Sequence, residues 1–135
     1  MLGYITIGAN DLPRSAGFYA AILTPLGYAA TEAADGVEFT APDGVGGAVA
    51  VYVKKPFDGK AATFGNGSMI AFRAAAHAMV RSLHAAGLRA GGSDEGAPGF
   101  REAYSAHFFV AYLRDPAGNK VAIYCADPAE GMRGC

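Results

Sequence analysis

Cysteine is scarce in this chain of 135 residues, which contains only Cys125 and Cys135. Two cysteines are too few for a disulfide framework or a zinc site, and their scarcity fits a reducing compartment. The sequence also lacks a charged N-terminal segment followed by an apolar run, and no apolar stretch reaches the roughly 18 residues of a membrane span. We therefore expect a cytoplasmic protein without a membrane partner.

An excess of either charge is missing as well. Lys and Arg total 11 against 12 Asp and Glu, so the formal net charge is −1. Because a protein that follows a phosphate backbone needs a basic surface, nucleic acid is not an expected partner. A chain of this length fits one domain, and folding buries roughly two thirds of the surface of the unfolded chain. We therefore expect a single domain over residues 1–135.

The first half of the chain has the pattern of a strand, a helix and three short strands. Residues 3–8 are rich in strand formers, and Asp11 can cap a helix that carries Pro13 in its first turn. Apolar residues at three- and four-residue spacing predict that this helix continues until Pro25. Turn residues, including those at 42–44, separate three further predicted strands. These strands are predicted at residues 28–33, 37–40 and 48–54.

The second half repeats this order after a loop at residues 56–67. An apolar face at helical spacing follows over residues 76–87. The Gly-rich stretch at residues 91–100 is interpreted as a connection without strand structure. Strands are predicted at residues 68–74, 107–114 and 120–125.

A short internal repeat supports a duplication. Residues 48–52 (AVAVY) align with residues 120–124 (KVAIY), each after a turn that contains Pro, Asp and Gly. Two copies of one module predict an α+β fold of two βαβββ modules, which form a curved mixed sheet around a cleft with one helix packed on each half. The halves are expected at about residues 1–55 and 67–128.

Two motifs resemble the vicinal oxygen chelate superfamily, which includes glyoxalases, bleomycin resistance proteins and extradiol dioxygenases. They are Asp-Leu-x-x-Ser-x-x-Phe-Tyr at residues 11–19 and Asp-Pro-x-Gly-Asn at residues 115–119. Residues 25–28 (PLGY) and 96–104 (GAPGFREAY) are similar to a bacterial glyoxalase-like branch. The resemblance spans nearly the whole chain, and it implies a single glyoxalase-like domain that forms a homodimer.

Enzymes of this superfamily hold a divalent metal with His or Glu side chains from the first and last strands of each half. The resemblance places these four positions at Tyr4, Ala50, Met69 and Ala122. Alanine has no donor atom, a thioether is soft, and a neutral phenol is a poor ligand for a hard cation. The mapping therefore implies no metal and no other cofactor, and it makes a metal-dependent dioxygenase the least expected activity.

Strand alternation places several tyrosines, a methionine and Lys120 on the cleft side. Such a surface suits a flat or aromatic small molecule, and an arginine can bind an anionic group through paired donors. The alternatives are that the aromatic side chains fill the cleft as core, and that Arg101 forms a surface ion pair with Glu102 or Asp94. The predicted ligand-binding residues are Tyr4, Tyr52, Met69, Arg73, Arg101 and Tyr124.

Two functions follow from these observations. The first is a metal-free cleft that binds a small molecule and sequesters an aromatic or anionic compound, comparable to drug-sequestering resistance proteins. The alternative is a glyoxalase-type lyase or isomerase acting on a small oxygen-rich substrate, in which His107 or Tyr104 handles protons as the catalytic residue. His107 can also be a histidine at a strand end that hydrogen-bonds to the adjacent loop. A binder leaves its ligand chemically unchanged, whereas an enzyme does not.

Overall fold

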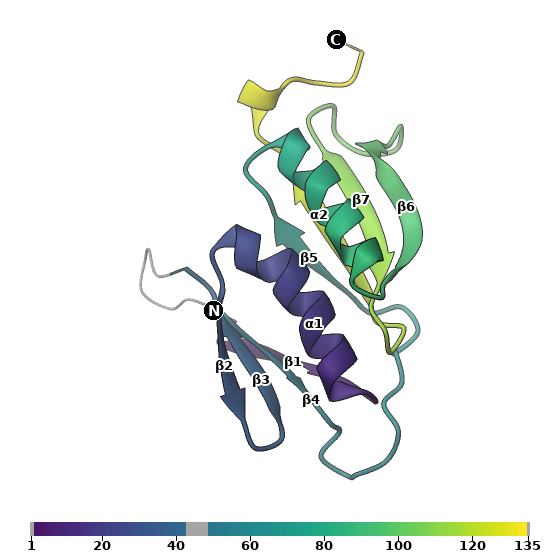
Figure 1. Cartoon of the computed structure of the whole chain (residues 1–135). Coiled ribbons are helices and arrows are strands. Elements are labelled where there is room, and N and C mark those ends of the chain that lie inside the picture. The colour runs from purple at the N-terminus through teal and green to yellow at the C-terminus, as the bar shows by residue number, and fades with distance from the viewer. Residues whose placement is uncertain (1, 43–48, 135) are drawn as a thin grey trace.

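The structure is a computed structural model, and it describes residues 2–42 and 49–134. Figure 1 shows two similar halves, each built from a four-stranded sheet and one α-helix. The predicted turn at residues 42–44 and the predicted strand start at residue 48 fall largely or wholly outside the described residues. Within them, no helix is long and apolar enough to cross a membrane.

The first half forms a mixed sheet with the strand order β1-β4-β3-β2. Strands β1 and β4 are parallel, whereas β3 pairs with β4 and with β2 in antiparallel orientation. A short 3₁₀ helix, η1, follows α1. The elements are β1 (Tyr4–Gly8), α1 (Leu12–Leu23), η1 (Thr24–Leu26), β2 (Ala29–Ala33), β3 (Gly36–Thr40) and β4 (Ala50–Lys54).

The second half forms a sheet of the same topology, with the strand order β5-β8-β7-β6. The predicted α+β fold of two βαβββ modules is therefore confirmed, although the eight strands form two separate sheets rather than one continuous sheet. The elements are β5 (Met69–Arg73), α2 (His77–Arg89), β6 (Ser93–Phe100), β7 (Phe109–Arg114), β8 (Lys120–Cys125) and the 3₁₀ helix η2 (Pro128–Glu130).

The interpretation of residues 91–100 as a connection is wrong, because Ser93–Phe100 forms the edge strand β6. Its glycines and proline weaken the local strand signal, yet pairing with β7 supplies backbone hydrogen bonds that do not depend on side-chain type. Two register shifts interrupt this pairing, which fits an edge strand. A Cβ at Gly96 would lie 2.8 Å from the Tyr112 ring, so close strand packing requires glycine there.

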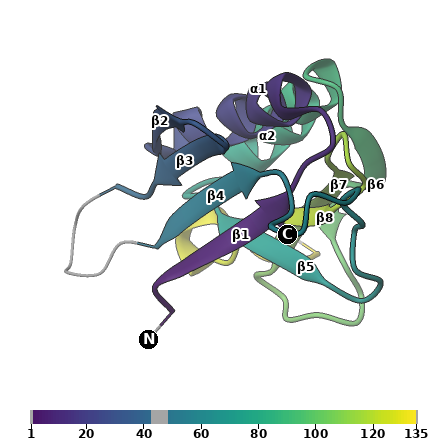
Figure 2. The same cartoon turned by 90° about the horizontal axis from the view of Figure 1, so that it is seen from below.

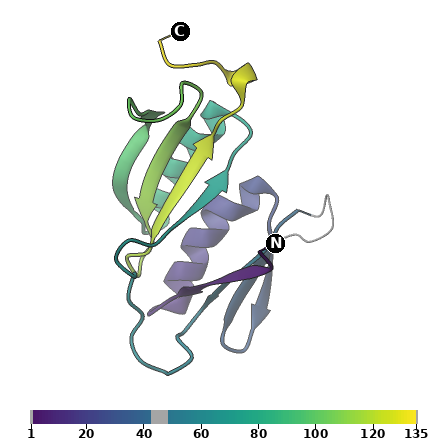
Figure 3. The same ribbon diagram turned by 180° about the vertical axis from the view of Figure 1, so that it is seen from behind.

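Both helices cover the same side of the two sheets, as Figure 2 shows. Helix α1 begins where predicted, because Asp11 accepts a hydrogen bond from the backbone N–H of Arg14 at 3.2 Å. The apolar stripe of α1 is buried, including Phe18 and Ile22, and Val80 and Leu83 of α2 are buried as well. Figure 3 looks onto the opposite faces of the sheets, which we call the open face.

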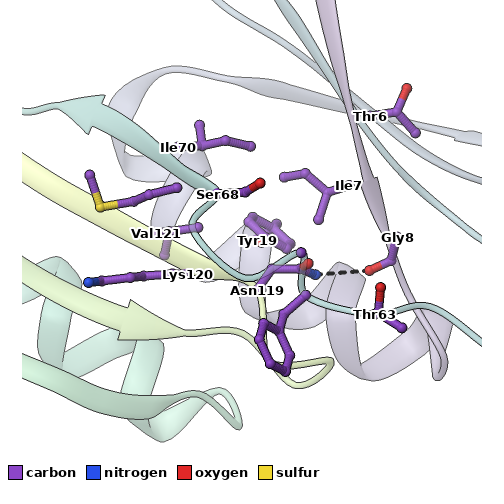
Figure 4. A pocket seen from close by; sticks show the side chains of 13 residues that line it. Thr6, Ile7, Gly8, Tyr19, Thr63, Ser68, Ile70, Asn119, Lys120 and Val121 are labelled. Carbon is purple, nitrogen blue, oxygen red and sulfur yellow. Dashed lines mark hydrogen bonds between the residues drawn. The ribbon is translucent and has the colours of Figure 1, made fainter.

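The Asp-Pro-x-Gly-Asn motif joins the two halves. Buried Asp115 accepts a hydrogen bond of 2.6 Å from the hydroxyl of Tyr19 in α1. The Asn119 amide donates to Asp115 at 2.8 Å and to the carbonyl of Gly8, at the end of β1, at 3.0 Å. Figure 4 shows the second of these contacts. The motif therefore fixes the second-half turn against the strand and helix of the first half.

Candidate functional site

Strand alternation determines which side chains reach the open face. In β8, Val121, Ile123 and Cys125 belong to the core beneath the helices, so the alternating residues point the other way. The same rule applies to the other strands around the centre of each sheet. The resulting open-face residues include Tyr4, Thr6, Ala50, Tyr52 and Lys54 in the first half, and Met69, Ala71, Arg73, Tyr112, Lys120, Ala122 and Tyr124 in the second.

The two halves differ in the register of their parallel strands. In the first half Tyr4 lies beside Ala50, the two positions that the resemblance assigns to metal ligands. In the second half Met69 lies beside Lys120, whereas Ala122 lies beside Ala71. This offset of two residues keeps all side chains on the same face, but it brings a lysine next to Met69.

The main candidate site is a hollow of about 540 Å³ on the open face of the second half, which we call the Lys120 hollow. Its volume lies within the range of small-molecule sites. Met69 and Lys120 lie side by side in its wall, Tyr112 comes from β7, and Arg101 and Tyr104 come from the loop between β6 and β7. Three of the predicted site residues therefore come together here.

Positive charge surrounds the ring of Tyr112. The Lys120 ammonium lies 5.0 Å from the ring centroid, and the Arg101 guanidinium carbon lies 5.5 Å from it. No carboxylate oxygen of the described residues lies within 4.0 Å of the Lys120 ammonium. Glu95 also lines the hollow, but it forms an ion pair with Arg114 at 3.2 Å. The half-buried Lys120 ammonium therefore has no ion-pair partner among these residues.

Arg101 is held by the end of strand β6. Its guanidinium donates hydrogen bonds to the backbone carbonyls of Ala97 at 2.8 Å, Gly99 at 3.1 Å and Phe100 at 3.3 Å. Three of its five N–H donors are therefore engaged by the protein. Among the described residues no carboxylate, including those of the alternative partners Glu102 and Asp94, lies within ion-pair distance of Arg101.

Tyr112 and Tyr104 form a pair of interacting phenols. Burial raises the pKa of Tyr112, and the hydrogen bond to Tyr104 and the proximity of Tyr104 raise it further, while Arg101 lowers it. The net direction is upward, so Tyr112 is a neutral hydroxyl at physiological pH. The neutral Tyr112 hydroxyl can therefore donate a hydrogen bond to a ligand atom.

Two other predicted residues, Arg73 and Tyr124, line a separate hollow of about 730 Å³ at the far end of the same sheet. The two residues are register partners on β5 and β8. Phe108 stacks on Tyr124 with ring centroids 5.2 Å apart, and Tyr104 packs edge-on against Phe108 at 5.5 Å. This aromatic chain connects the two hollows along the open face.

Tyr4 and Tyr52 lie on the open face of the first half, outside both hollows. Their ring centroids lie 5.3 Å apart in an edge-to-face arrangement, and Tyr4 is 65% exposed. Burial and the neighbouring Glu38 carboxylate raise the pKa of Tyr52. The structure thus distributes the predicted ligand-binding residues over three places rather than one.

His107 lies against the C-terminal tail and does not line the Lys120 hollow. Its Nδ1 is 3.4 Å from the carbonyl oxygen of Gly131 in that tail, whereas the alternative prediction was a bond to the adjacent loop, and β7 begins only at Phe109. The nearby Arg133 donates to three carbonyls of the loop between β6 and β7, those of Arg101, Glu102 and Tyr104. The tail and this loop lie at the same end of the molecule in Figure 1.

A smaller hollow of about 240 Å³ lies at the junction of the halves, between β1, the start of β5 and the motif turn. Figure 4 shows Ser68, Ile70 and Asn119 around it, with Tyr19 behind. Met69 and Lys120 line this hollow as well as the Lys120 hollow. These two side chains therefore form a common wall between two accessible spaces.

The four positions of a family-type metal do not fit a divalent cation. Tyr4, Ala50, Met69 and Ala122 all belong to the open-face sets, but they offer only one phenol and one thioether as donors. Within the described residues, no three His, Cys, Asp or Glu side chains cluster closely enough to hold a metal.

Sequence reasoning placed Lys120 on the cleft side but left it out of the predicted ligand-binding set, and it missed Tyr112 and Glu95. Alternation from buried Ala111 and Leu113 was the available signal for Tyr112. Glu95 had no such signal, because its strand was interpreted as a connection.

Comparisons with known proteins agree with this architecture. A profile of the Glyoxalase/Bleomycin resistance protein/Dioxygenase superfamily matches residues 1–123. None of the curated proteins matches the chain. A solved glyoxalase/bleomycin resistance protein from Albidiferax ferrireducens T118 is 33% identical, with a TM-score of 0.80 over 94% of this chain and 99% of that one.

A lactoylglutathione lyase from Agrobacterium tumefaciens shares the fold at 18% identity, with a TM-score of 0.60 over 93% of this chain and 92% of that one. At that level of identity the likeness concerns the fold alone. The profile match covers most of the sequence and agrees with the resemblance carried by the two motifs. The chain therefore belongs to the glyoxalase/bleomycin resistance protein/dioxygenase superfamily.

Proposed function

We propose that this protein binds a small organic molecule in the Lys120 hollow, without the divalent metal that enzymes of the superfamily use. The observation that supports this proposal is the combination of Met69, Lys120, Tyr112 and Tyr104 in one hollow of about 540 Å³. Met69 and the tyrosine rings supply apolar surface there, and Lys120 and the tyrosine hydroxyls supply polar groups that can orient a small molecule. In this role the protein sequesters an aromatic or anionic compound and leaves it chemically unchanged.

Metal independence rests on the donor chemistry of the four family positions. Elemental analysis of the purified protein, before and after incubation with divalent metals, tests it directly. We expect less than stoichiometric metal and no change in melting temperature, because a metal bound to the native state alone would raise that temperature. Stoichiometric metal accompanied by thermal stabilisation would contradict the proposal.

Ligand binding is tested by a thermal-shift screen of small aromatic compounds, followed by NMR on the protein with labelled tyrosines. We expect binders to shift the ring signals of Tyr112 and Tyr104 more than those of Tyr4 and Tyr52. The variant Tyr112→Ala should remove this response, while Tyr52→Ala, on the other half, should retain it. Binders that shift only Tyr4 and Tyr52 would place the site on the first half and contradict the proposal.

A lyase or isomerase of the glyoxalase type is the second candidate function. The paired hydroxyls of Tyr104 and Tyr112 favour it, because a phenol beside a second phenol can pass a proton to a ligand atom. His107 is held at the tail, so Tyr104 is the stronger choice for proton transfer. Turnover of lactoylglutathione, the compound in the name of the structurally similar lyase, provides an assay. Activity that Tyr104→Phe abolishes would support the enzyme.

We also propose a cytoplasmic homodimer, as the family resemblance implies. One chain has a mass of 13.8 kDa. Size-exclusion chromatography with light scattering should therefore give about twice that mass in dilute solution, and fractionation of cells should recover the protein with the cytoplasmic fraction. A mass equal to one chain would contradict the dimer.

A further inference from the structure

We infer that the ligand of the Lys120 hollow is an organic carboxylate with a flat apolar group, and that the Lys120 ammonium binds its charge. This inference rests on the proposed function and specifies its ligand class. In this inference the Lys120 ammonium attracts the anionic oxygen of the ligand. The family's metal positions nearby lack donors that could hold a metal for that purpose.

The first step is the charge of Lys120. Its ammonium reaches the hollow from β8, beside Met69 and two residues before Ala122. No carboxylate of the described residues neutralises it at ion-pair distance. By contrast, Lys54, the open-face lysine of the first half, is paired with Asp35 at 2.8 Å. A half-buried ammonium without such a partner attracts an anion more strongly than a solvated one, because solvent screens it less.

The second step is the hydrogen-bonding complement of the hollow. A carboxylate accepts hydrogen bonds from ammonium and hydroxyl groups, and it offers two oxygens for them. Lys120 provides ammonium donors, and the Tyr112–Tyr104 pair provides a neutral hydroxyl. Arg101, although largely held by the end of β6, adds positive charge 5.5 Å from the centre of the Tyr112 ring. Donors therefore converge on the hollow from β8, β7 and the loop.

The third step is the apolar part of the ligand. Met69 is 46% exposed and Tyr104 is 48% exposed, and both line the hollow. A thioether and an aromatic face pack well against a flat ring, which they would remove from water. Glu95 and Glu102 also line the hollow; Glu95 is neutralised by Arg114, and Glu102 is exposed. A flat group between Met69 and Tyr104 thus leaves its carboxylate facing Lys120.

The test compares acids with their neutral amides. Isothermal titration measures the Kd of benzoate against benzamide, and of 1-naphthoate against 1-naphthamide, at low and high salt. We expect each acid to bind at least about tenfold more tightly than its amide, because a charged hydrogen bond contributes more than a neutral one. Added salt should weaken the acids and leave the amides unchanged.

Variants identify the responsible cation. Lys120→Met, which keeps the length of the side chain, should remove the preference for the acids, and Lys120→Arg should restore it to within about threefold of the original protein. Lys60→Met removes an exposed lysine from the loop before β5 and should change nothing. Circular dichroism melting of each variant verifies that it folds.

The outcomes separate this inference from the proposed function. If the amides bind as tightly as the acids, or if Lys120→Met keeps the acid preference, the inference is overturned while small-molecule binding stands. If neither acid nor amide binds, and no compound from the wider screen shifts the Tyr112 signals, both are overturned. An acid preference that depends on Lys120 and is restored by arginine supports both.

Discussion

The open faces of the two halves differ although their topology is the same. In the first half the edge strand β2 is short, fully exposed and joined to β3 by a tight turn. In the second half the corresponding strand β6 is eight residues long and is followed by a loop that carries Arg101 and Tyr104. That loop supplies the outer wall of the Lys120 hollow. The duplication thus sets the direction of the side chains, and the loop between β6 and β7 creates the site.

The charges on the two faces follow the same division. Lys54 of the first half is paired with Asp35, and Tyr52 lies near Glu38. The second half places Lys120 and Arg101 around Tyr112. The inferred anionic ligand is therefore expected at the second half, and the halves can be altered separately.

The largest effect is expected at the junction that both halves share. Asp115 accepts hydrogen bonds from the Tyr19 hydroxyl, from the Asn119 amide and from the backbone N–H groups of Ala117 and Asn119. Asp115→Ala should lower the free energy of unfolding by about 3 to 5 kcal/mol, because the buried Tyr19 hydroxyl and three part-buried N–H donors lose their acceptor at once. Urea unfolding followed by circular dichroism measures this.

Tyr19→Phe is the matched control, since it removes one of those hydrogen bonds and keeps the buried ring. It should cost about 1 to 2 kcal/mol. An Asp115→Ala loss no larger than that of Tyr19→Phe would show that the hydrogen bonds within the motif turn add nothing to the one that crosses to the first half.

A smaller effect, of opposite sign in the two helices, is expected for glycine-to-alanine changes. A Cβ at Gly87 in α2 would lie 2.6 Å from Leu113 and 3.2 Å from Phe18, whereas a Cβ at Gly17 in α1 meets no atom within 4 Å. Gly87→Ala should therefore destabilise the protein by about 1 to 3 kcal/mol through overpacking. Gly17→Ala should stabilise it by about 0.5 to 1 kcal/mol through higher helix propensity. Thermal and urea unfolding of both variants provide the measurement.

Most of the fold could be predicted from the sequence, because helix stripes, caps and turns leave local signals. Asp11 and Pro13 marked the start of α1, and the alternation in β8 identified its two faces. Strand β6 could not be predicted in this way. Gly96 is required by packing against Tyr112, and the pairing of β6 is irregular; both features arise only when β7 lies beside it.

The candidate site could be predicted only in part. The family mapping located Met69, and the motif at residues 96–104 located Arg101 and Tyr104. The structure brings these three together, but the sequence did not separate them from Arg73 and Tyr124. The register of β5 against β8, which places Lys120 beside Met69, depends on pairing between distant segments. No local pattern in the sequence contains that register.

The C-terminal tail is expected to contribute moderately, and only to the second half. Arg133 donates to three carbonyls of the loop that bears Arg101 and Tyr104. Arg133→Ala should speed hydrogen exchange of the Tyr104 amide, which donates a hydrogen bond within this loop. It should also weaken benzoate binding by about threefold, because losing the exposed hydrogen bonds of Arg133 costs under about 1 kcal/mol. Arg133→Lys retains the charge but not the fork, so it should give an intermediate result. Unchanged exchange in Arg133→Ala would show that the loop holds its shape without the tail.

The smallest effect is a pH dependence, and it again separates the halves. Lys54 lowers the pKa of Asp35 below its usual value of 3.8 in the first half. In the second half the backbone N–H of Gly96, with His84, lowers the pKa of Asp94. Because the folded pKa is depressed in both cases, each carboxylate stabilises the fold above the unfolded pKa and loses that contribution as pH falls through the folded pKa. Unfolding in urea at several pH values below about 5 measures this.

The two depressed pKa values should respond differently to loss of their side-chain partners. Lys54→Met should return the pKa of Asp35 nearly to its usual value, because both main causes come from that lysine. His84→Gln should leave much of the depression at Asp94, because the hydrogen bond from Gly96 at 3.0 Å persists. Carboxyl carbon NMR titration resolves the two residues. If His84→Gln restored Asp94 fully, β6 would depend on helix α2 for its local structure, and the edge strand would not hold its irregular shape by backbone contacts alone.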